Sequence, residues 1–534
     1  MKKTAAVLSL AVLSMIATPA PAAPFKKGPE FQVNDYTTSY QDFPRVAMHS
    51  SGSFVVVWND YQQDSSTYDV MGRIFDSSGQ PAGPSFQVNT TTLDYQRFPA
   101  IAMDSLGNFV VVWDDYGTDG DGYGITGQRF DSAGTKLGGE FVVNSYTTGW
   151  QRFPDITMAP SGDFVVAWES YGQDGDYYGV FGRLFDSSGT PLATEFQVNQ
   201  YTTGDQQYPR VAMNSSGDFI VVWQSYGQDG SYNGIEGRRF DNTAAPLGSE
   251  FAVNSYTTYD QLYPVTTMAP DGSFIVAWDS SQEDGSGTGI FMRRFDSDGA
   301  PLSGDLQVNT YTTDYQDVPA ISSNSSGDFV VVWNSFGQNN PSSYYDVFGQ
   351  AFLSDGTRAG DEFQVNTYTP DYQWFPSVSV NDSGDFVVAW DSFYQDGSVS
   401  GIFGQGFFTP FVPSGGFAVT SPADGSTVDC SDPATIRPTF AWTTGPFDKF
   451  KVWVGYDPNF PQGTRIKSGK WKPITSWEPN KKKWKAACKK ALIGDPLNPV
   501  LFVRVQGKDV DVPSTDSNRL AFTPTIMVKV NFGP

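Results

Sequence analysis

One pattern of about 55 residues is repeated seven times along most of the chain. The clearest marker of each repeat is an apolar run that ends in tryptophan, at Trp58, Trp113, Trp168, Trp223, Trp278, Trp333 and Trp390. Successive tryptophans are 55 residues apart, except for the last pair, which is 57 residues apart. A repeat of this length is one structural unit that packs against its copies, so it decides the fold before any single motif does.

Each repeat contains four strand signals, as the third copy illustrates. Residues 153–158 and 163–168 are predicted as strands joined by a Ser-Gly turn, and residues 180–185 and 196–199 follow as the third and fourth strands. Aromatic and β-branched residues fill the strands, whereas Gly, Ser and Asp supply the turns. The second strand is continuously apolar, which indicates burial on both faces of the sheet.

Four-stranded sheets repeated four to eight times around an axis form a β-propeller. The sequence therefore predicts an all-β protein with a seven-bladed β-propeller over residues 23–409. Residues 31–34 give a fourth-strand signal with no blade before it, and the seventh copy ends at its third strand, residues 401–408. We expect residues 31–34 to complete the seventh blade; the alternative is that residues 417–420 complete it.

Residues 1–22 have the pattern of a secretory signal peptide. Lys2 and Lys3 precede a short apolar stretch, and Ala20-Pro21-Ala22 fits a cleavage site. No later stretch reaches the roughly 18–20 apolar residues that a membrane-spanning helix needs. We therefore expect a monomer, secreted or periplasmic, without a membrane span.

The pattern changes after a Pro/Gly/Ser linker at residues 410–416. Strand signals at residues 438–442, 450–454 and 501–505, the first ending in Trp442, resemble bacterial fibronectin type III or immunoglobulin-like domains. The resemblance implies a small β-sandwich over residues 417–534 that acts as a spacer or attachment module. In an oxidising compartment Cys430 and Cys488 are predicted to form a disulfide; the alternative is two unpaired thiols.

Charge is unevenly distributed between the two regions. Residues 23–414 contain 48 acidic and 15 basic residues, whereas residues 415–534 contain 10 acidic and 17 basic residues. An acidic domain repels phosphate backbones, so we expect no binding of nucleic acid by the propeller. The lysines of residues 481–490 fit either contact with an acidic polymer or a solvated basic loop.

Loop lengths distinguish the two faces of the predicted propeller. The turns between the first and second strands and between the third and fourth strands are short. The loops between the second and third strands, and the crossovers from the fourth strand to the next blade, are longer, and both lie on the other face. We call it the loop-rich face and expect function there, since loops carry binding residues more often than the scaffold does.

Glutamine occupies the same crossover position in every repeat, three residues before a proline: Gln41, Gln96, Gln151, Gln206, Gln261, Gln316 and Gln373. An aromatic residue precedes it in most copies, including Trp150 and Tyr372. One interpretation is that these residues bind sugars, and the other is that the amides tie neighbouring blades together.

A second set lies in the loop after each second strand. An aromatic residue follows the tryptophan by three positions in six copies, and an acid or asparagine follows it by six. Aromatic rings stack on sugars while carboxylates and amides bond to hydroxyls. The candidate ligand-binding residues are Tyr61, Asp64, Tyr116, Asp119, Trp150, Gln151, Tyr171, Asp174, Tyr226, Asp229, Tyr372, Gln373 and Asp396. The alternative is that the acids bond to neighbouring loops.

Calcium is a further prediction, although no cofactor is required. Asp119-Gly120-Asp121 and Asp174-Gly175-Asp176 resemble fragments of calcium loops, but no Glu closes either at the twelfth position. The residue after each tryptophan is also polar: Asn59, Asp114, Glu169, Gln224, Asp279, Asn334 and Asp391. These side chains fit either a cation at the channel mouth or solvated strand ends.

Most catalytic classes lack their residues. The only histidine, His49, falls in a short turn, residues 23–409 contain no cysteine, and no phosphate-binding loop is present. A glycosidase needs two carboxylates, and Glu169, Glu236 and Glu283 depart from the repeat. The sequence still favours a binding protein over an enzyme.

The repeats resemble secreted bacterial propeller-repeat proteins in general, which implies an architecture rather than an activity. The favoured function is a secreted binding module whose partner is a polysaccharide or cell-surface glycoconjugate. The alternatives are a cell-surface scaffold for protein partners and a carbohydrate-active hydrolase.

Overall fold

A computed structural model describes residues 24–61, 67–92, 94–339 and 344–409, together with nine short strands between residues 419 and 531. The predicted signal peptide, the predicted linker and both Cys430 and Cys488 lie outside the described residues. In the part that is described, no helix is long and apolar enough to cross a membrane.

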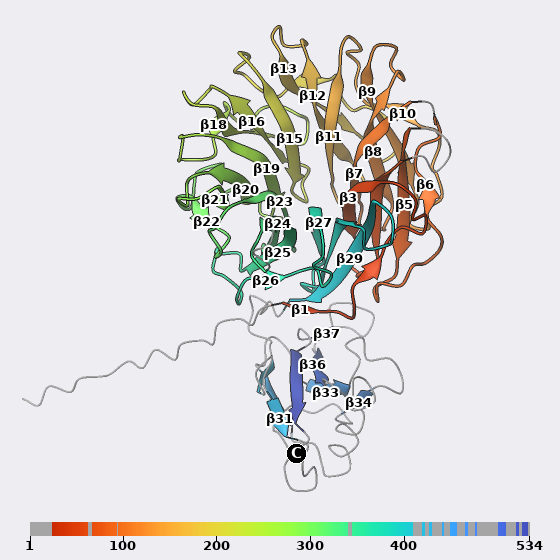
Figure 1. The fold of residues 1–534 in the computed structure, drawn as a ribbon, viewed down its shortest axis with the longest axis vertical. Helices are drawn as coiled ribbons and strands as arrows, with labels where there is room; N and C mark the ends of the chain where they lie inside the picture. The colour runs from red at the N-terminus through yellow and green to blue at the C-terminus, as the bar shows by residue number, and fades with distance from the viewer. Residues whose placement is uncertain are drawn as a thin grey trace, which may run out of the picture.

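Seven sheets surround a central axis, which confirms the predicted seven-bladed propeller (Figure 1). The first blade comprises β3 (Gln41–Met48), β4 (Phe54–Tyr61), β5 (Tyr68–Phe75) and β6 (Phe86–Gln87). The second comprises β7 (Gln96–Met103), β8 (Phe109–Tyr116), β9 (Tyr123–Phe130) and β10 (Phe141–Val142). The third comprises β11 (Gln151–Met158), β12 (Phe164–Tyr171), β13 (Tyr178–Phe185) and β14 (Phe196–Gln197). The fourth comprises β15 (Gln206–Met213), β16 (Phe219–Tyr226), β17 (Asn233–Phe240) and β18 (Phe251–Ala252).

The remaining blades follow the same order. The fifth comprises β19 (Gln261–Met268), β20 (Phe274–Ser281), β21 (Thr288–Phe295) and β22 (Leu306–Gln307). The sixth comprises β23 (Gln316–Ser323), β24 (Phe329–Phe336), β25 (Tyr345–Phe352) and β26 (Phe363–Gln364). The seventh contains β27 (Gln373–Val380), β28 (Phe386–Phe393) and β29 (Ser400–Phe408).

The second strands form the core between blades, as their apolar runs predict. All seven repeat tryptophans are at most 1% exposed. Val165 and Ala167 on β12 pack in one cluster with Val221 and Trp223 on β16, so each second strand packs against its neighbour's. In a strand that is buried on both faces, every apolar side chain stabilises the fold because it is removed from water. This explains why the run that ends in each repeat tryptophan contains no polar residue.

The outer edge of each blade has a matched pair of residues. On β13, Gly182 pairs with Phe196 on β14, and a Cβ atom at Gly182 would lie 2.8 Å from Cζ of Phe196. The fifth blade instead pairs Met292 with Leu306. In the third blade the phenylalanine on the fourth strand leaves room only for glycine on the third strand. In the fifth blade the smaller leucine on the fourth strand leaves room for methionine.

The N-terminal strands close the ring. β2 (Phe31–Gln32) pairs with β29, and β1 (Phe25–Lys26) pairs further along the same strand (Figure 1). The predicted closure by residues 31–34 is confirmed. The alternative fails because β30 (Val419–Ser421) pairs with β32 (Phe440–Trp442) rather than with the seventh blade.

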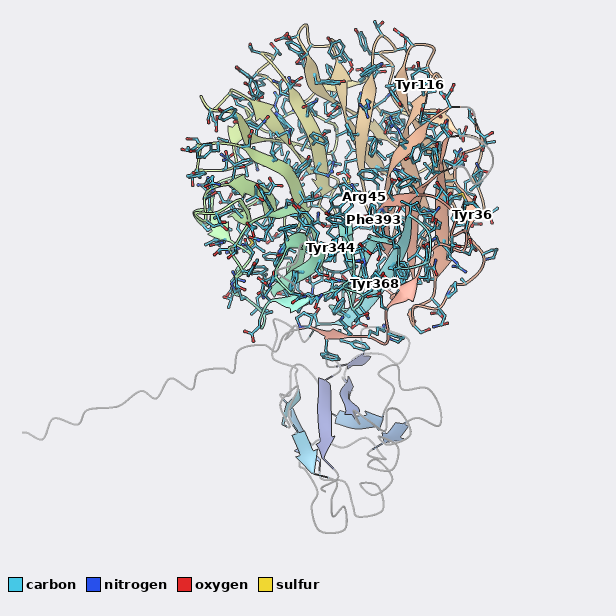
Figure 2. All side chains as sticks on the ribbon, in the orientation of Figure 1. Tyr36, Arg45, Tyr116, Tyr344, Tyr368 and Phe393 are labelled. Atoms are coloured by element: carbon cyan, nitrogen blue, oxygen red, sulfur yellow. The ribbon has the colours of Figure 1, made fainter. Side chains whose placement is uncertain are left out.

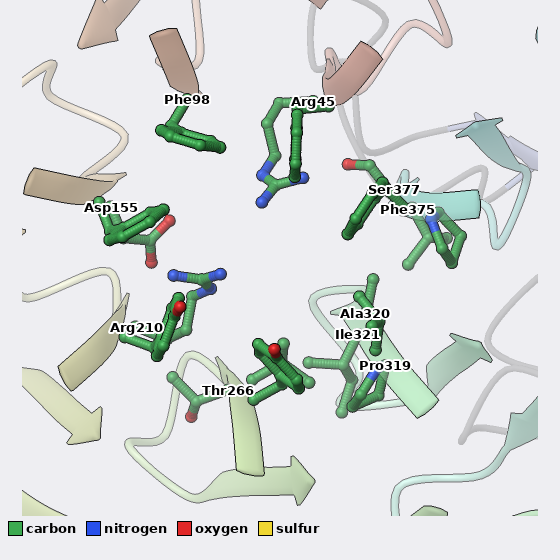
Figure 3. A pocket seen from close by; sticks show the side chains of 18 of the residues that line it. Arg45, Phe98, Asp155, Arg210, Thr266, Pro319, Ala320, Ile321, Phe375 and Ser377 are labelled. Carbon is green, nitrogen blue, oxygen red and sulfur yellow. The ribbon is translucent and has the colours of Figure 1, made fainter. Parts of the chain in front are cut away.

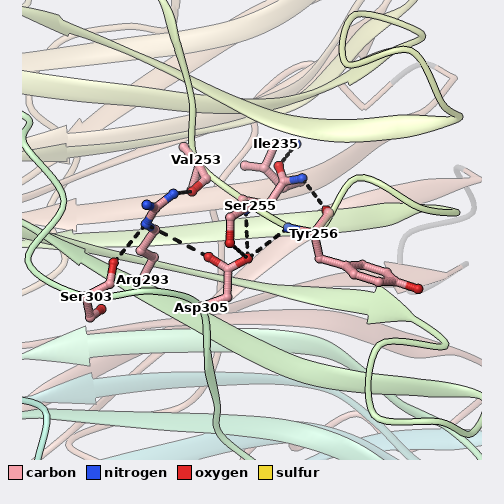
Figure 4. A network of polar contacts seen from close by, with 8 residues as sticks. Ile235, Val253, Ser255, Tyr256, Arg293, Ser303 and Asp305 are labelled. Atoms are coloured by element: carbon pink, nitrogen blue, oxygen red, sulfur yellow. Dashed lines mark hydrogen bonds and ion pairs between the residues drawn. The ribbon is translucent and has the colours of Figure 1, made fainter.

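Carboxylates clasp each blade to the preceding one, as Figure 4 shows for the fourth and fifth blades. Asp305 accepts bonds from both the backbone N–H and the hydroxyl of Ser255, each at 2.7 Å. Arg293 donates across the same boundary to the carbonyl of Val253 at 2.9 Å. The equivalent acids at the other boundaries are Glu140, Glu195, Glu250, Glu362 and, at the closure, Glu30. Between the seventh and first blades the roles reverse, because Ser85 donates to Asp35.

The C-terminal strands form two sheets. The first orders β30, β32 and β35 (Ser476–Trp477). The second contains β31 (Thr427–Asp429), β33 (Lys449–Gly455), β34 (Arg465–Lys467), β36 (Val500–Lys508), β37 (Leu520–Phe522) and β38 (Ile526–Asn531). The predicted strand signals at residues 450–454 and 501–505 fall within β33 and β36.

Candidate functional site: the loop-rich face and the central channel

The repeated glutamines are fully buried. Gln206 accepts a hydrogen bond from Nδ2 of Asn199 at 3.1 Å and donates to the carbonyl of Thr203 at 3.2 Å. Asn199 follows the last strand of the third blade and Gln206 begins the fourth, and the same bond recurs at five other boundaries. Buried amides with filled bonding capacity hold a structure together, so the contacts of Gln151 fit the interpretation that the amides tie blades together. Gln373 differs, because its oxygen accepts the indole N–H of Trp390 in its own blade at 3.0 Å.

The acids of the loop-rich face bond mainly within their own blade. Asp119 and Asp174 each accept a bond from Nδ2 of an asparagine after the fourth strand, at 2.9 and 3.0 Å. Asp229 and Asp396 each accept a backbone N–H two residues later at 2.9 Å. Asp64 lies outside the described residues. The described acids therefore shape the loops that carry the aromatic side chains.

The predicted calcium loops hold their carboxylates in similar bonds. Oδ2 of Asp121 accepts the backbone N–H of Gly149 at 3.2 Å, and Oδ2 of Asp176 accepts that of Gly204 at 2.9 Å. Within the described ranges, no three His, Cys, Asp or Glu residues gather into a group that could hold a metal ion. Calcium binding stays a prediction.

Aromatic side chains are the exposed feature of the loop-rich face. We call them the rim aromatics: Tyr40, Tyr116, Trp150, Tyr171, Tyr177, Tyr226, Tyr232, Tyr259, Tyr315 and Tyr394, each 41–57% exposed. Figure 2 shows Tyr116 toward the outer part of the ring. Tyr61 and Tyr372, also predicted as ligand residues, are half-buried. The face thus offers repeated flat apolar surfaces beside polar loops.

Several rim aromatics lie in groups that cross blade boundaries. The ring centroids of Tyr116 and Tyr123 are 5.0 Å apart, and those of Tyr123 and Trp150 are 6.3 Å apart. Tyr116 and Tyr123 belong to the second blade, whereas Trp150 precedes the third. Neighbouring rings support one another, which fixes their orientation before any ligand arrives.

The central channel contains a cavity of about 250 Å³ lined by the first strands (Figure 3). At its wall stands a collar of seven equivalent residues: Phe43, Phe98, Phe153, Tyr208, Tyr263, Val318 and Phe375. Neighbouring rings touch, with the centroids of Phe98 and Phe153 4.6 Å apart. The sequence pattern showed this position only as part of a strand, and the collar was not predicted.

Every collar residue has a left-handed backbone, with φ between 49° and 52°. This conformation is unfavourable for residues other than glycine. The residue after the repeat tryptophan supports it: the N–H of Tyr208 donates to Glu169 at 3.1 Å, and that of Tyr263 donates to Gln224 at 3.3 Å. The residues after the tryptophans are all buried, so their interpretation as solvated strand ends is wrong.

The change Glu169→Gln is expected to stabilise the protein at high pH. Burial raises the pKa of Glu169 from 4.5 to about 8. The unfolded chain therefore releases this proton first as the pH rises, and stability is lost between about pH 4.5 and pH 8. Gln keeps the acceptor for Tyr208 without the charge, so the gain in unfolding free energy is on the order of 2 kcal/mol at pH 8 and near zero at pH 4. Urea unfolding at both pH values measures it.

The fourth blade supplies the reciprocal control. Gln224 bonds to Tyr263 as Glu169 bonds to Tyr208. Gln224→Glu should therefore destabilise at pH 8 and have little effect at pH 4. A gain from Glu169→Gln that is equal at both pH values would show that burial of the charge is not its cause.

No family model matches the chain, and no curated protein matches it. Similar solved structures include a protein of unknown function from Dyadobacter fermentans, with 10% identity, a TM-score of 0.44, and coverage of 72% of this chain and 99% of that chain. A fungal alcohol oxidase of the AA5 family in complex with copper has 11% identity, a TM-score of 0.46, and coverage of 94% and 99%. An α-L-arabinanase of Penicillium chrysogenum complexed with arabinobiose has 15% identity, a TM-score of 0.37, and coverage of 57% and 94%. At these values, they carry no argument about activity.

Proposed function

We propose that this protein is an exported binding module that holds a polysaccharide or glycoconjugate on its loop-rich face. The observation that carries the proposal is the exposure of the rim aromatics, each 41–57% exposed, whereas the seven repeat tryptophans are at most 1% exposed. Exposed rings cost free energy in water, and sugar faces are apolar surfaces that cover them.

The repeat adds a reason to favour a polymer over a small molecule. Tyr116, Tyr171 and Tyr226 occupy the same position in three consecutive blades and are 43–50% exposed. Equivalent weak contacts at fixed spacing gain affinity when one long ligand engages several of them. The acids bond within the loops that carry these rings. The rings of Tyr116 and Tyr171 also pack against a neighbouring tyrosine, so they need little reordering on binding.

A triple variant, Tyr116→Ala with Tyr171→Ala and Tyr226→Ala, is expected to weaken polysaccharide binding at least about tenfold, because each lost stacking surface contributes on the order of 0.5–1.5 kcal/mol. The unfolding midpoint should change little, since all three rings are half-exposed. Affinity electrophoresis against a panel of neutral and acidic polysaccharides measures the retention.

The control is the pair Leu192→Ala and Leu247→Ala. These leucines are 56% and 48% exposed and follow the short turns of the opposite face. Retention equal to wild type is expected for the control. If the tyrosine variant is retained as strongly as the control, the loop-rich face does not bind the polymer, and a protein partner becomes the better hypothesis.

A further inference from the structure

Two arginines point into the central channel, at a position where four of the other five blades carry a neutral residue. Arg45 on β3 and Arg210 on β15 line the cavity together with Asp155 on β11 (Figure 3). The equivalent positions in the other blades are Ala100, Val265, Ala320 and Ser377. Four blades therefore form the same strand with an uncharged side chain, so neither the blade nor the ring needs an arginine here.

The guanidinium groups have few protein partners. Arg45 donates a hydrogen bond to the carbonyl of Pro44 at 3.0 Å, and Arg210 donates one to the carbonyl of Pro209 at 2.9 Å. Among the described residues, no carboxylate oxygen lies within 4.0 Å of either group. A guanidinium has five N–H donors, so most of the donors on both side chains face the cavity.

Asp155, the acid that lines the same cavity, bonds to the backbone rather than to either arginine. Oδ2 of Asp155 accepts the backbone N–H of Val211 at 2.8 Å. The hydroxyl of Ser377 performs the same role at the equivalent position, accepting the N–H of Val46 at 3.2 Å. Asp155 therefore accepts a backbone N–H from β15, the first strand of the next blade. Arg45, Arg210 and Asp155 together give the channel a net charge of +1.

Arg45 and Arg210 point into the same space in the channel (Figure 3). Burial and the neighbouring charge of Arg210 lower the pKa of Arg45 to about 10, so Arg45 stays charged at neutral pH. Two partly buried like charges, which no carboxylate among the described residues pairs, repel each other, at a cost to the stability of the protein. An anion bound between them removes this cost and gains charge-assisted hydrogen bonds.

We propose that the central channel binds a carboxylate-bearing ligand, with its carboxylate held by Arg45 and Arg210 and its ring-sized body against the aromatic collar. Arginine forks match the two oxygens of a carboxylate, and the collar offers ring faces that suit a sugar or an aromatic ring. The cavity of about 250 Å³ suits one such ring. The carboxylate has two sources, a sugar acid and a free aromatic acid. This site is separate from the rim aromatics and does not depend on the proposed polymer binding.

Matched probes test the site by isothermal titration on the full chain. Methyl glucuronoside and methyl glucoside differ in the carboxylate, and benzoate represents the aromatic acid. At least one of the two acids should bind wild type at least about tenfold more tightly than methyl glucoside. Binding by methyl glucuronoside indicates a sugar acid as the source, and binding by benzoate alone indicates a free aromatic acid.

Three variants separate a ligand site from a structural role. Arg45→Ala with Arg210→Ala, which introduces the residue of the second and sixth blades, should abolish the preference for the acid. Asp155→Asn keeps an acceptor for Val211 and removes the negative charge, so it should tighten the acid several-fold. Arg239→Ala is the control. It removes an arginine that bonds to the carbonyl of Ser297 outside the channel, so it should leave binding of the acid unchanged.

Either of two results overturns the proposal. One is that neither acid binds wild type better than methyl glucoside. The other is that the preference for the acid survives in the double arginine variant. Because the tyrosine variant keeps both arginines, it should retain the acid probe even where polymer binding is lost.

Discussion

Deletion of residues 24–34 is expected to lower the free energy of unfolding of the propeller by at least about 5 kcal/mol. The deletion removes β1 and β2, the outer strands of the seventh blade. Phe31 also packs against Phe54 and Phe75 of the first blade, with ring centroids 6.1 and 5.4 Å apart, and Val33 is fully buried. Loss of one large aromatic and one β-branched core side chain alone accounts for several kcal/mol.

The same deletion removes the clasp at the closure. Glu30 accepts the backbone N–H of Thr367 at 2.6 Å, and the carbonyl of Val33 accepts a bond from Arg73 at 2.8 Å. Urea unfolding followed by tryptophan fluorescence measures the change, because the seven repeat tryptophans are buried. The control is a chain that begins at residue 24. A deletion that unfolds at the same urea concentration as this control would mean that the ring is closed without the N-terminal strands.

Gly182→Met is expected to destabilise the protein by about 3 kcal/mol, and Phe196→Leu should restore much of the loss. A Cβ atom at Gly182 already lies 2.8 Å from Cζ of Phe196, so a longer side chain forces the ring out of its site. Overpacking of this kind typically costs about 1–3 kcal/mol. The fifth blade shows the compensated arrangement, since Met292 faces Leu306 there.

A double-mutant cycle measures the coupling between the two positions. Phe196→Leu alone should destabilise, because a partly buried ring that packs against the core is lost, and the double variant should be more stable than Gly182→Met. The reciprocal pair, Met292→Gly with Leu306→Phe, is the matched control in the fifth blade. Additive effects of the two substitutions in the third blade would contradict a direct steric exchange.

The propeller fold could be predicted because the same strand and turn pattern recurs seven times in the sequence. Tryptophans such as Trp168 and Trp223 mark second strands that are buried on both faces, and burial of that kind leaves a continuous apolar run in the sequence. The closure was also predictable, because residues 31–34 match a strand that the seventh copy lacks. Repetition turns a weak local signal into a strong one by placing it at a fixed spacing.

The central channel could not be predicted from the same pattern. Phe153 and its equivalents look like ordinary strand residues, and the sequence does not reveal the left-handed backbone that turns them into a collar. Arg45 and Arg210 are 165 positions apart and meet because the ring brings their blades to one axis. Their signal was a departure from the repeat, a charge at a position that is otherwise small or neutral in most copies.

The glutamines show why repetition alone does not separate a ligand site from a structural contact. A residue kept in every copy fits both a ring of ligand sites and a ring of structural ties, and Gln206 is fully buried in a tie between blades. Among the candidate ligand residues, exposure separates Tyr116, Trp150, Tyr171 and Tyr226 from the buried amides. Exposure depends on the packing of whole blades, and spacing along the chain does not report it.

The most direct test of a glycan-binding face is thermal unfolding of the mature protein with a panel of neutral and acidic polysaccharides. A ligand that binds only the folded state raises the transition temperature. The account predicts a rise with at least one polymer and a smaller rise in the triple tyrosine variant. No rise with any polymer, or an equal rise in wild type and in the variant, would contradict it.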